Sequence, residues 1–296
     1  MENVLTLIGA AGVVLADDLV ADLRASLRGL GADVAPPEWL SPGRVLDLRF
    51  GHLAPEQADA AARQCLGSLK VDVVAQAQAG RRKQLLVADM DSTMVVGETL
   101  DELAEYAGIK DKIAAITARA MNGELVFEDA LRERIGLLDG LPESALAETW
   151  GRTALMPGAV TLVRTMKANG AYAVLVSGGF TYFTSRVREA CGFDVDLGNR
   201  FIFKKGKLAG VEDPILGRET KLSTLINTAG ERQIPLSLAV AVGDGANDLD
   251  MIRAAGLGVA FHAKPVVAAE ARVRVDHGDL TALLYAQGYG DHDFVA

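Results

Sequence analysis

The chain has few of the residues that build disulfide frameworks or thiolate metal centres. It contains only two cysteines, Cys65 and Cys191, among 296 residues. Two cysteines so far apart make no disulfide framework, and they lack the close spacing of a zinc or redox motif. We therefore expect both to be small buried hydrophobic side chains. The four histidines are also not spaced as metal ligands or as partners of a nucleophile. They are His52, His262, His277 and His292.

Long hydrophobic runs are also missing. No uninterrupted apolar stretch approaches the ~20 residues that are needed to span a bilayer. Residues 4–16 imitate the apolar part of a signal peptide, but Glu2 stands where a positive charge is typical, and Asp17-Asp18 replaces a small-residue cleavage site. We therefore predict a cytoplasmic protein that has no membrane partner.

Positive charge is in deficit, with 30 Lys and Arg against 39 Asp and Glu, a net charge of −9. No basic stripe stands out, so the sequence predicts no nucleic-acid partner. Half of the residues are hydrophobic and 23% are charged, which is typical of a soluble globular protein. A chain of this length should hold about two domains and bury a large core.

Residues 1–76 are predicted to form a small α+β domain without a catalytic constellation. Apolar strands are expected at 4–8, 46–50 and 69–74, and helices at 16–30 and 55–66. The order strand, helix, two strands, helix, strand resembles the ACT-like regulatory domains that are often fused to amino-acid enzymes. This resemblance implies a regulatory domain, either binding serine or mediating a homodimer. Residues 77–83, with Gly80 and three consecutive basic residues, are the expected linker.

Residues 84–296 are predicted to form an α/β domain with a helical insertion. Apolar strands at 85–88, 171–176 and 238–242 alternate with helices at 159–168, 180–190 and 219–229. Repeated strand–helix units indicate a parallel sheet with helices on both faces. Four helices between about 97 and 156 interrupt this sheet just after its first strand, as a cap over an active site would. A β-hairpin is expected at 201–203 and 208–211.

The most informative stretch is Asp89-Met90-Asp91-Ser92-Thr93, directly after the apolar run Leu85–Ala88. In an extended chain, residues two apart lie on one face, so both carboxylates would point the same way. Open α/β sheets place their chemistry at this end of a strand. The alternative interpretation is an acidic turn in which Ser92 or Thr93 caps the next helix.

Two further strands also end in polar residues. Ser177-Gly178-Gly179 follows the strand at 171–176, and Gly243-Asp244-Gly245-Ala246-Asn247-Asp248 follows the strand at 238–242. The carboxyl ends of parallel strands share one rim, so these groups can converge. Aspartate oxygens without Cys or His favour a hard cation such as Mg²⁺. A Ser-Gly-Gly turn before a helix offers N–H groups and a hydroxyl to an anion.

Together, a cation site, an anion cradle and paired acids indicate phosphoryl transfer. Lys221 could supply a positive charge there, although a solvated surface lysine is the alternative. Arg134 falls on the apolar stripe of the helix that begins at Phe127, where it either reaches solvent or faces an anion. Calcium binding of the EF-hand type is excluded, because the regular acid spacing and the final glutamate are missing.

These motifs, in this order, resemble the four motifs of the haloacid dehalogenase (HAD) superfamily. Within it the chain is similar to the phosphatases of O-phosphoserine, on the evidence of Val96-Gly97-Glu98-Thr99 and of the helix from Phe127 to Arg134. The resemblance covers about residue 84 to the C-terminus. It implies a HAD-like Rossmannoid sheet with a four-helix cap, and a Mg²⁺-dependent hydrolysis of O-phosphoserine in the last step of serine biosynthesis.

The resemblance also implies a role for each motif residue. Asp89 would be the nucleophile and Asp91 the general acid and base. The metal would be held by Asp89, the backbone carbonyl of Asp91 and Asp244, with Asp248 positioning its waters. The residues implied in substrate binding are Glu98, Met121, Phe127, Arg134, Ser177, Gly178, Lys221 and Asn247.

Two alternatives remain open. A related HAD phosphatase or phosphotransferase could act on another small phosphomonoester, although Glu98 with Arg134 favours an amino-acid substrate. A non-catalytic amino-acid sensor would use the first 76 residues instead, but intact Asp89, Asp91, Lys221 and Asp244 argue against it.

Overall fold

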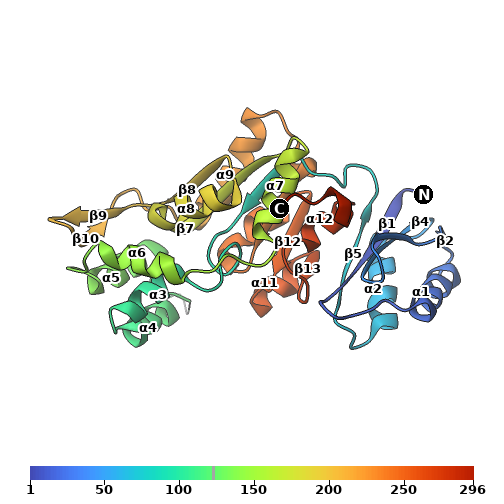
Figure 1. The fold of residues 1–296 in the computed structure, drawn as a ribbon, viewed down its shortest axis with the longest axis horizontal. Coiled ribbons are helices and arrows are strands. Elements are labelled where there is room, and N and C mark those ends of the chain that lie inside the picture. Colours follow the sequence, from blue (N-terminus) through green and yellow to red (C-terminus); the bar gives the residue numbers. More distant parts are fainter. Residues whose placement is uncertain (122–123) are drawn as a thin grey trace.

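A computed structural model describes residues 1–121 and 124–296 of the chain (Figure 1). The first 77 residues form what we call the N-terminal unit, an antiparallel sheet with two helices. Its strands pair in the order β2-β4-β1-β5, with β3 added beside β4. The elements are β1 (Asn3–Gly9), α1 (Asp17–Gly29), β2 (Asp33–Val34), β3 (Glu38–Ser41), β4 (Val45–Gly51), α2 (Pro55–Leu66) and β5 (Val71–Ala77).

Both faces of this small sheet are buried. Leu5 and Leu7 of β1 point into a core shared with the helices α1 and α2. Ile8, Val45 and Val74 belong instead to the core of the rest of the chain. The N-terminal unit is therefore packed directly on the remainder of the molecule.

The second sheet is parallel and has six strands in the order β13-β12-β11-β6-β7-β8. This confirms the predicted α/β class and the HAD-like sheet. The strands β8, β12 and β13 were not predicted. The six strands are β6 (Leu85–Ala88), β7 (Tyr172–Phe180), β8 (Val195–Asn199), β11 (Ala239–Gly243), β12 (Leu257–Phe261) and β13 (Val273–Val275).

Helices cover both faces of this sheet because its strands are apolar on both sides. Leu85 and Val87 pack with Leu225 of α9 and Met251 of α10. Leu86 and Ala88 lie in the opposite core, which also contains the helices α7, α8 and α12. The helices are α7 (Ala159–Ala168), α8 (Thr181–Cys191), α9 (Arg218–Glu231), α10 (Leu249–Ala254), α11 (Pro265–Glu270) and α12 (Ala282–Ala286).

The insertion contains the four predicted helices and lies at the opposite end of the molecule from the N-terminal unit (Figure 1). We call it the cap. Its two connecting segments are joined by backbone hydrogen bonds, from the N–H of Val96 to the Ala154 carbonyl and from the N–H of Met156 to the Met94 carbonyl. The predicted hairpin is also present and packs against α5. These elements are α3 (Thr99–Tyr106), α4 (Lys110–Met121), α5 (Phe127–Leu137), α6 (Ser144–Arg152), β9 (Phe201–Lys204) and β10 (Lys207–Val211).

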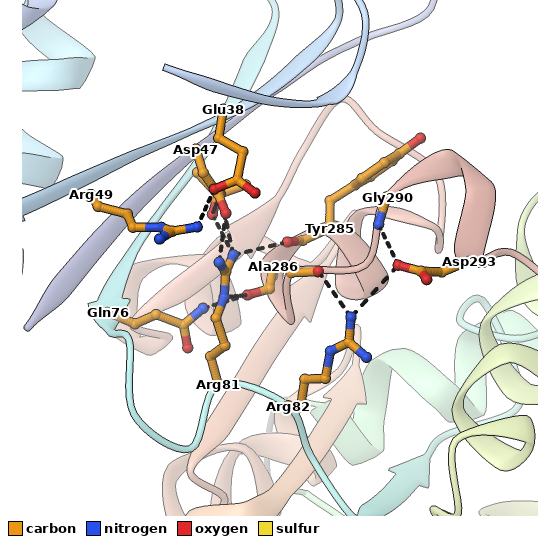
Figure 2. A network of polar contacts seen from close by, with 12 residues as sticks. Glu38, Asp47, Arg49, Gln76, Arg81, Arg82, Tyr285, Ala286, Gly290 and Asp293 are labelled. Carbon is orange, nitrogen blue, oxygen red and sulfur yellow. Dashed lines mark hydrogen bonds and ion pairs between the residues drawn. The ribbon is translucent and has the colours of Figure 1, made fainter. Parts of the chain in front are cut away.

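The segment that connects the two sheets is tied down on both sides (Figure 2). Arg81 is buried, and its guanidinium donates to the Asp47 carboxylate of β4, with Nη1 to Oδ2 at 2.5 Å. The same guanidinium donates to the carbonyl oxygens of Tyr285 and Ala286 on α12. The expected linker is therefore a structural part of the interface.

None of the helices in the described residues is long and apolar enough to cross a membrane.

Candidate active site

Three strand ends of the parallel sheet meet at one rim, as their register requires. β6 leads to Asp89 and Asp91, β7 ends with Ser177–Phe180, where its pairing with β8 is irregular, and β11 leads to Asp244. The N–H of Asp89 continues the ladder by donating to the Val242 carbonyl at 3.0 Å. The rim and the cap enclose a cavity of about 550 Å³. Predicted site residues that line it are Asp89, Asp91, Glu98, Phe127, Arg134, Ser177, Gly178, Asp244 and Asn247.

The carboxylates of Asp89, Asp244 and Asp248 form a buried cluster, with an oxygen of each within 4.8 Å of the others. The Lys221 ammonium lies 2.7 Å from Asp89 Oδ1 and 2.5 Å from Asp248 Oδ1. Lys221 is only 2% exposed, so it is not the surface lysine of the alternative interpretation. Asp248 is also held by the N–H of Gly245 at 2.9 Å.

Burial and mutual repulsion set the protonation of this cluster. Burial and the neighbouring Asp248 raise the pKa of Asp89 well above its usual value, although Lys221 opposes this. Burial also raises the pKa of Asp244 to about 6. For Lys221, burial lowers the pKa, but the carboxylates of Asp248 and Asp89 outweigh it and the net shift is upward. The lysine is therefore a permanent cation between two acids.

Asp91 has a different environment from Asp89. Its carboxylate accepts the N–H of Thr99, the first residue of α3, at 2.8 Å and the Ser177 hydroxyl at 3.3 Å. It is not part of the acidic cluster. Burial, and then the nearby Glu98 carboxylate, raise the pKa of Asp91 to about 6. A carboxyl group with such a pKa can both donate and accept a proton near neutral pH.

The segment Ser177–Gly179 was predicted as a turn, but it belongs to the irregular end of β7 and is shaped by its own hydrogen bonds. Ser177 Oγ accepts the N–H of Gly179 at 2.8 Å, and the side chain of Asn199 donates to the Gly178 carbonyl at 2.8 Å. A Cβ on Gly179 would lie 2.8 Å from Asp91 Oδ2, so a larger residue would collide with the acid. The sequence places glycine at this position, where the chain passes close to a reactive group.

The cap supplies groups to the opposite wall of the cavity. Glu98 accepts a hydrogen bond from the Ser92 hydroxyl at 2.9 Å. A Cβ on Gly178 would lie 3.1 Å from Phe127 Cζ, which shows how closely the cap approaches the rim. Arg134 lines the cavity, and among the described residues it makes no ion pair. Met121 ends α4, and its side chain lies outside the described part of the chain.

Three supporting residues were not predicted as part of the site. Thr99 and Ser92 orient Asp91 and Glu98 through the hydrogen bonds given above. Lys264 lines the cavity, and its ammonium lies 3.6 Å from Asp244 Oδ2. The same rule about strand ends could have found Lys264, because it follows the apolar run Leu257–Phe261 by three residues.

The donor set suits a hard divalent cation. The three clustered side chains offer only carboxylate oxygens, and the cluster contains no Cys or His. Three ionised carboxylates carry more negative charge than the single ammonium of Lys221 can neutralise. A bound divalent ion would remove this conflict.

Comparison with known proteins gives a consistent result. The family model of haloacid dehalogenase-like hydrolases matches residues 86–253. The chain is 43% identical over 219 residues to a phosphoserine phosphatase from Streptomyces coelicolor, covering 74% of this chain and 53% of that one. It is 40% identical over 203 residues to a phosphoserine phosphatase from Lactococcus lactis, covering 68% of this chain and 94% of that one. The chain spans between 58% and 64% of the length of three other curated relatives.

Solved structures extend the similarity to both parts of the chain. A probable phosphoserine phosphatase from Vibrio cholerae, in unliganded form, is 31% identical with a TM-score of 0.79, covering 99% of this chain and 88% of that one. A phospho-aspartyl intermediate analogue of phosphoserine phosphatase is 39% identical with a TM-score of 0.64, covering 69% of this chain and 98% of that one.

Proposed function

Because the chain belongs to the haloacid dehalogenase-like hydrolases, and within them to the phosphoserine phosphatase family, we propose that it hydrolyses O-phospho-L-serine to L-serine and phosphate. One observation carries this proposal. A single cavity contains the Asp89 and Asp91 pair on the sheet side and the opposite charges of Glu98 and Arg134 on the cap side. The first pair suits phosphoryl transfer, and the second suits the ammonium and carboxylate of an amino acid.

In the first step, a carboxylate oxygen of Asp89 forms a bond to phosphorus while the bond from phosphorus to the serine oxygen breaks. Asp91 donates its proton to the departing oxygen. In the second step, Asp91 takes a proton from a water molecule, which attacks the aspartyl-phosphate and releases phosphate. The pKa of about 6 at Asp91 supports both roles, and the solved phospho-aspartyl intermediate analogue supports the same route in a relative.

The surrounding residues would hold the phosphoryl group and the metal. Ser177, Gly178, Lys221 and Asn247 would bind the phosphoryl oxygens. Mg²⁺ would be held by Asp89, Asp244 and the backbone carbonyl of Asp91, with Asp248 positioning its waters. When bound, this ion would neutralise charge on the phosphoryl oxygens.

The cap would select the substrate. Arg134 would pair with the carboxylate of phosphoserine and Glu98 with its ammonium group. Burial lowers the pKa of Arg134, and the nearby Asp101 and Glu98 oppose this shift. Among the described residues, neither carboxylate forms an ion pair with the Arg134 guanidinium. Phe127 and Met121 would close the cavity and exclude water.

Phosphate release from L-phosphoserine tests the proposal. We expect release that requires Mg²⁺, stops with EDTA and falls by about 10³-fold or more in Asp89→Asn, because the nucleophile is lost. Asp250→Asn is the matched control, since Asp250 pairs with Arg218 outside the acidic cluster and should leave release unchanged. Release only from a generic aryl phosphate would keep the chemistry and overturn the substrate. No release from either would favour the amino-acid sensor.

Two expectations about the wider role remain predictions. The reaction would supply serine as the last step of its biosynthesis. A homodimer through the N-terminal unit would need α1, α2 or the outer strands, because the other face of the sheet packs on the rest of the chain. Light scattering in solution tests this dimer.

A further inference from the structure

A buried acid of the N-terminal unit reaches into the catalytic part of the chain. Asp72 lies on β5, which runs beside β13 at the edge of the parallel sheet. It is 2% exposed, and it accepts the N–H groups of Asp276 at 2.8 Å, His277 at 3.1 Å and Gly278 at 2.7 Å. Three consecutive donors on one carboxylate fix both the position and the shape of this turn.

The turn is connected to the active site by His262. The ring Nε2 of His262 lies 2.9 Å from the Gly278 carbonyl, which can only accept, so this nitrogen carries the proton. The N–H of His262 donates to the Val275 carbonyl at 2.9 Å. Two residues later, the N–H of Lys264 donates to the carbonyl of Asp244 at 3.0 Å. The turn therefore holds the segment from His262 to Lys264 against a residue of the acidic cluster.

The residues of this connection are closely packed. A Cβ on Gly278 would lie 3.0 Å from Asp72 Oδ2 and 3.3 Å from the Cβ of Ala282. His262 has φ of 43°, a left-handed backbone conformation that is unfavourable for a residue with a side chain. The hydrogen bonds from its ring and its N–H stabilise this conformation. If the turn moved, His262 would lose the contacts that keep Lys264 beside Asp244.

We propose that Asp72 is a positioning residue for the active site, acting through the turn at 276–278 and His262 on Lys264 and Asp244. The N-terminal unit thereby sets the geometry at the metal-binding end of β11 through a direct chain of hydrogen bonds. This inference rests on the proposed function, since it assigns the acidic cluster to a divalent cation.

Asp72→Asn in the full chain tests the proposal. The side-chain amide of asparagine has only one acceptor oxygen, and its NH₂ group would face backbone N–H groups. Some of the hydrogen bonds that Asp72 accepts from the turn would therefore be lost. We expect Mg²⁺ to bind about two- to thirtyfold more weakly by calorimetric titration, the range expected for coupling through a packed network. We expect His262→Gln to weaken binding similarly, and the double variant to add little more, because both act through one connection.

Asp47→Asn is the matched control. Asp47 is an equally buried acid on the same sheet, but its partners are Thr6 and Arg81, and it does not contact the turn. We expect this variant to lower the unfolding temperature and leave Mg²⁺ binding unchanged.

Three results would overturn the proposal. They are unchanged Mg²⁺ binding in Asp72→Asn, equal weakening in Asp47→Asn, and a wild-type chain that binds no Mg²⁺. The proposed function fails separately, when the wild-type chain binds Mg²⁺ but releases no phosphate from phosphoserine.

Discussion

At the scale of the residue, two aspartates two positions apart acquire different chemistry from their surroundings. Asp89 lies against the Lys221 ammonium and two other acids, so Lys221 stabilises its ionised form while burial and Asp248 oppose ionisation. Asp91 is partly buried near Glu98, and its donors include two neutral groups, the Thr99 N–H and the Ser177 hydroxyl. The first environment suits a nucleophile and the second suits a proton carrier.

Arg134 gives a direct test of substrate choice at this scale. We expect Arg134→Met to lower kcat/KM for phosphoserine by about 10- to 150-fold, the range for losing a hydrogen bond to a charged group. Phosphoethanolamine has no carboxylate, so its hydrolysis should change by less than about threefold on the same reasoning. Steady-state kinetics with both substrates measure the difference.

Arg132→Met is the control for this prediction. Arg132 lies on the same helix but pairs with Asp213 on the surface, so both substrates should be hydrolysed as before. An equal loss on both substrates in Arg134→Met would contradict a role in carboxylate recognition.

The sequence predicts reactive residues better than the residues that orient them. Asp89, Ser177 and Asp244 follow apolar strands, and the register of a parallel sheet brings such positions together. The backbone N–H of Thr99 holds Asp91, and because every residue other than proline provides such a group, this contact leaves no signal in the sequence. Asp72 was not predicted, because its partners are backbone groups 204 to 206 residues away.

At the scale of the element, the hairpin β9–β10 supports the cap. The N–H of Gly140, just after α5, donates to the Leu208 carbonyl, and the N–H of Leu208 donates to the Leu141 carbonyl. The Leu208 side chain is 2% exposed and belongs to the main core. The hairpin therefore fixes the end of the helix that contains Phe127 and Arg134.

We expect Leu208→Ala to lower the free energy of unfolding by about 2–5 kcal/mol, because it removes buried methyl groups and leaves a cavity. Leu137→Ala on α5 is the control, since Leu137 is 42% exposed and should change stability by less than about 0.5 kcal/mol. Urea unfolding of both variants makes the comparison. Equal losses would show that the hairpin is not anchored through Leu208.

The helices and strands that were predicted from the sequence are those with a clear pattern of apolar residues. The cap helices carry apolar residues three and four apart, and β6 is a pure apolar run. The strand β8 reads Val195-Asp196-Leu197-Gly198-Asn199, too short and too polar to distinguish from a loop, and β13 has only three residues. These edge strands are defined by their neighbours in the sheet rather than by their own sequence.

At the scale of the whole molecule, the N-terminal unit shares a hydrophobic core with the rest of the chain. Residues 77–83 were predicted as a linker because they are basic and contain Gly80. In the structure Arg81 and Lys83 are buried, and Lys83 donates to the carbonyls of Gly80 and Ser237. The C-terminal residues contribute to the same interface, since Tyr289 is 1% exposed and Arg82 lies over its ring. Local composition cannot reveal partners that come from the far end of the chain.

Arg81 tests whether this interface makes the two parts one cooperative unit (Figure 2). Arg81→Met would leave the Asp47 carboxylate buried with only the Thr6 hydroxyl as a side-chain donor among the described residues. Because an unpaired buried charge is costly, we expect the free energy of unfolding to fall by about 3–5 kcal/mol. We expect Arg81→Met with Asp47→Asn to recover part of this loss, since the charge is then removed as well.

Denaturant unfolding followed by both circular dichroism and tryptophan fluorescence measures the effect, with Trp39 in the N-terminal unit and Trp150 in the cap. If the interface couples the two parts, the two probes coincide in the wild-type chain and separate in Arg81→Met. An unchanged midpoint in Arg81→Met would mean that apolar packing of Ile8, Val45 and Val74 holds the N-terminal unit in place without the ion pair.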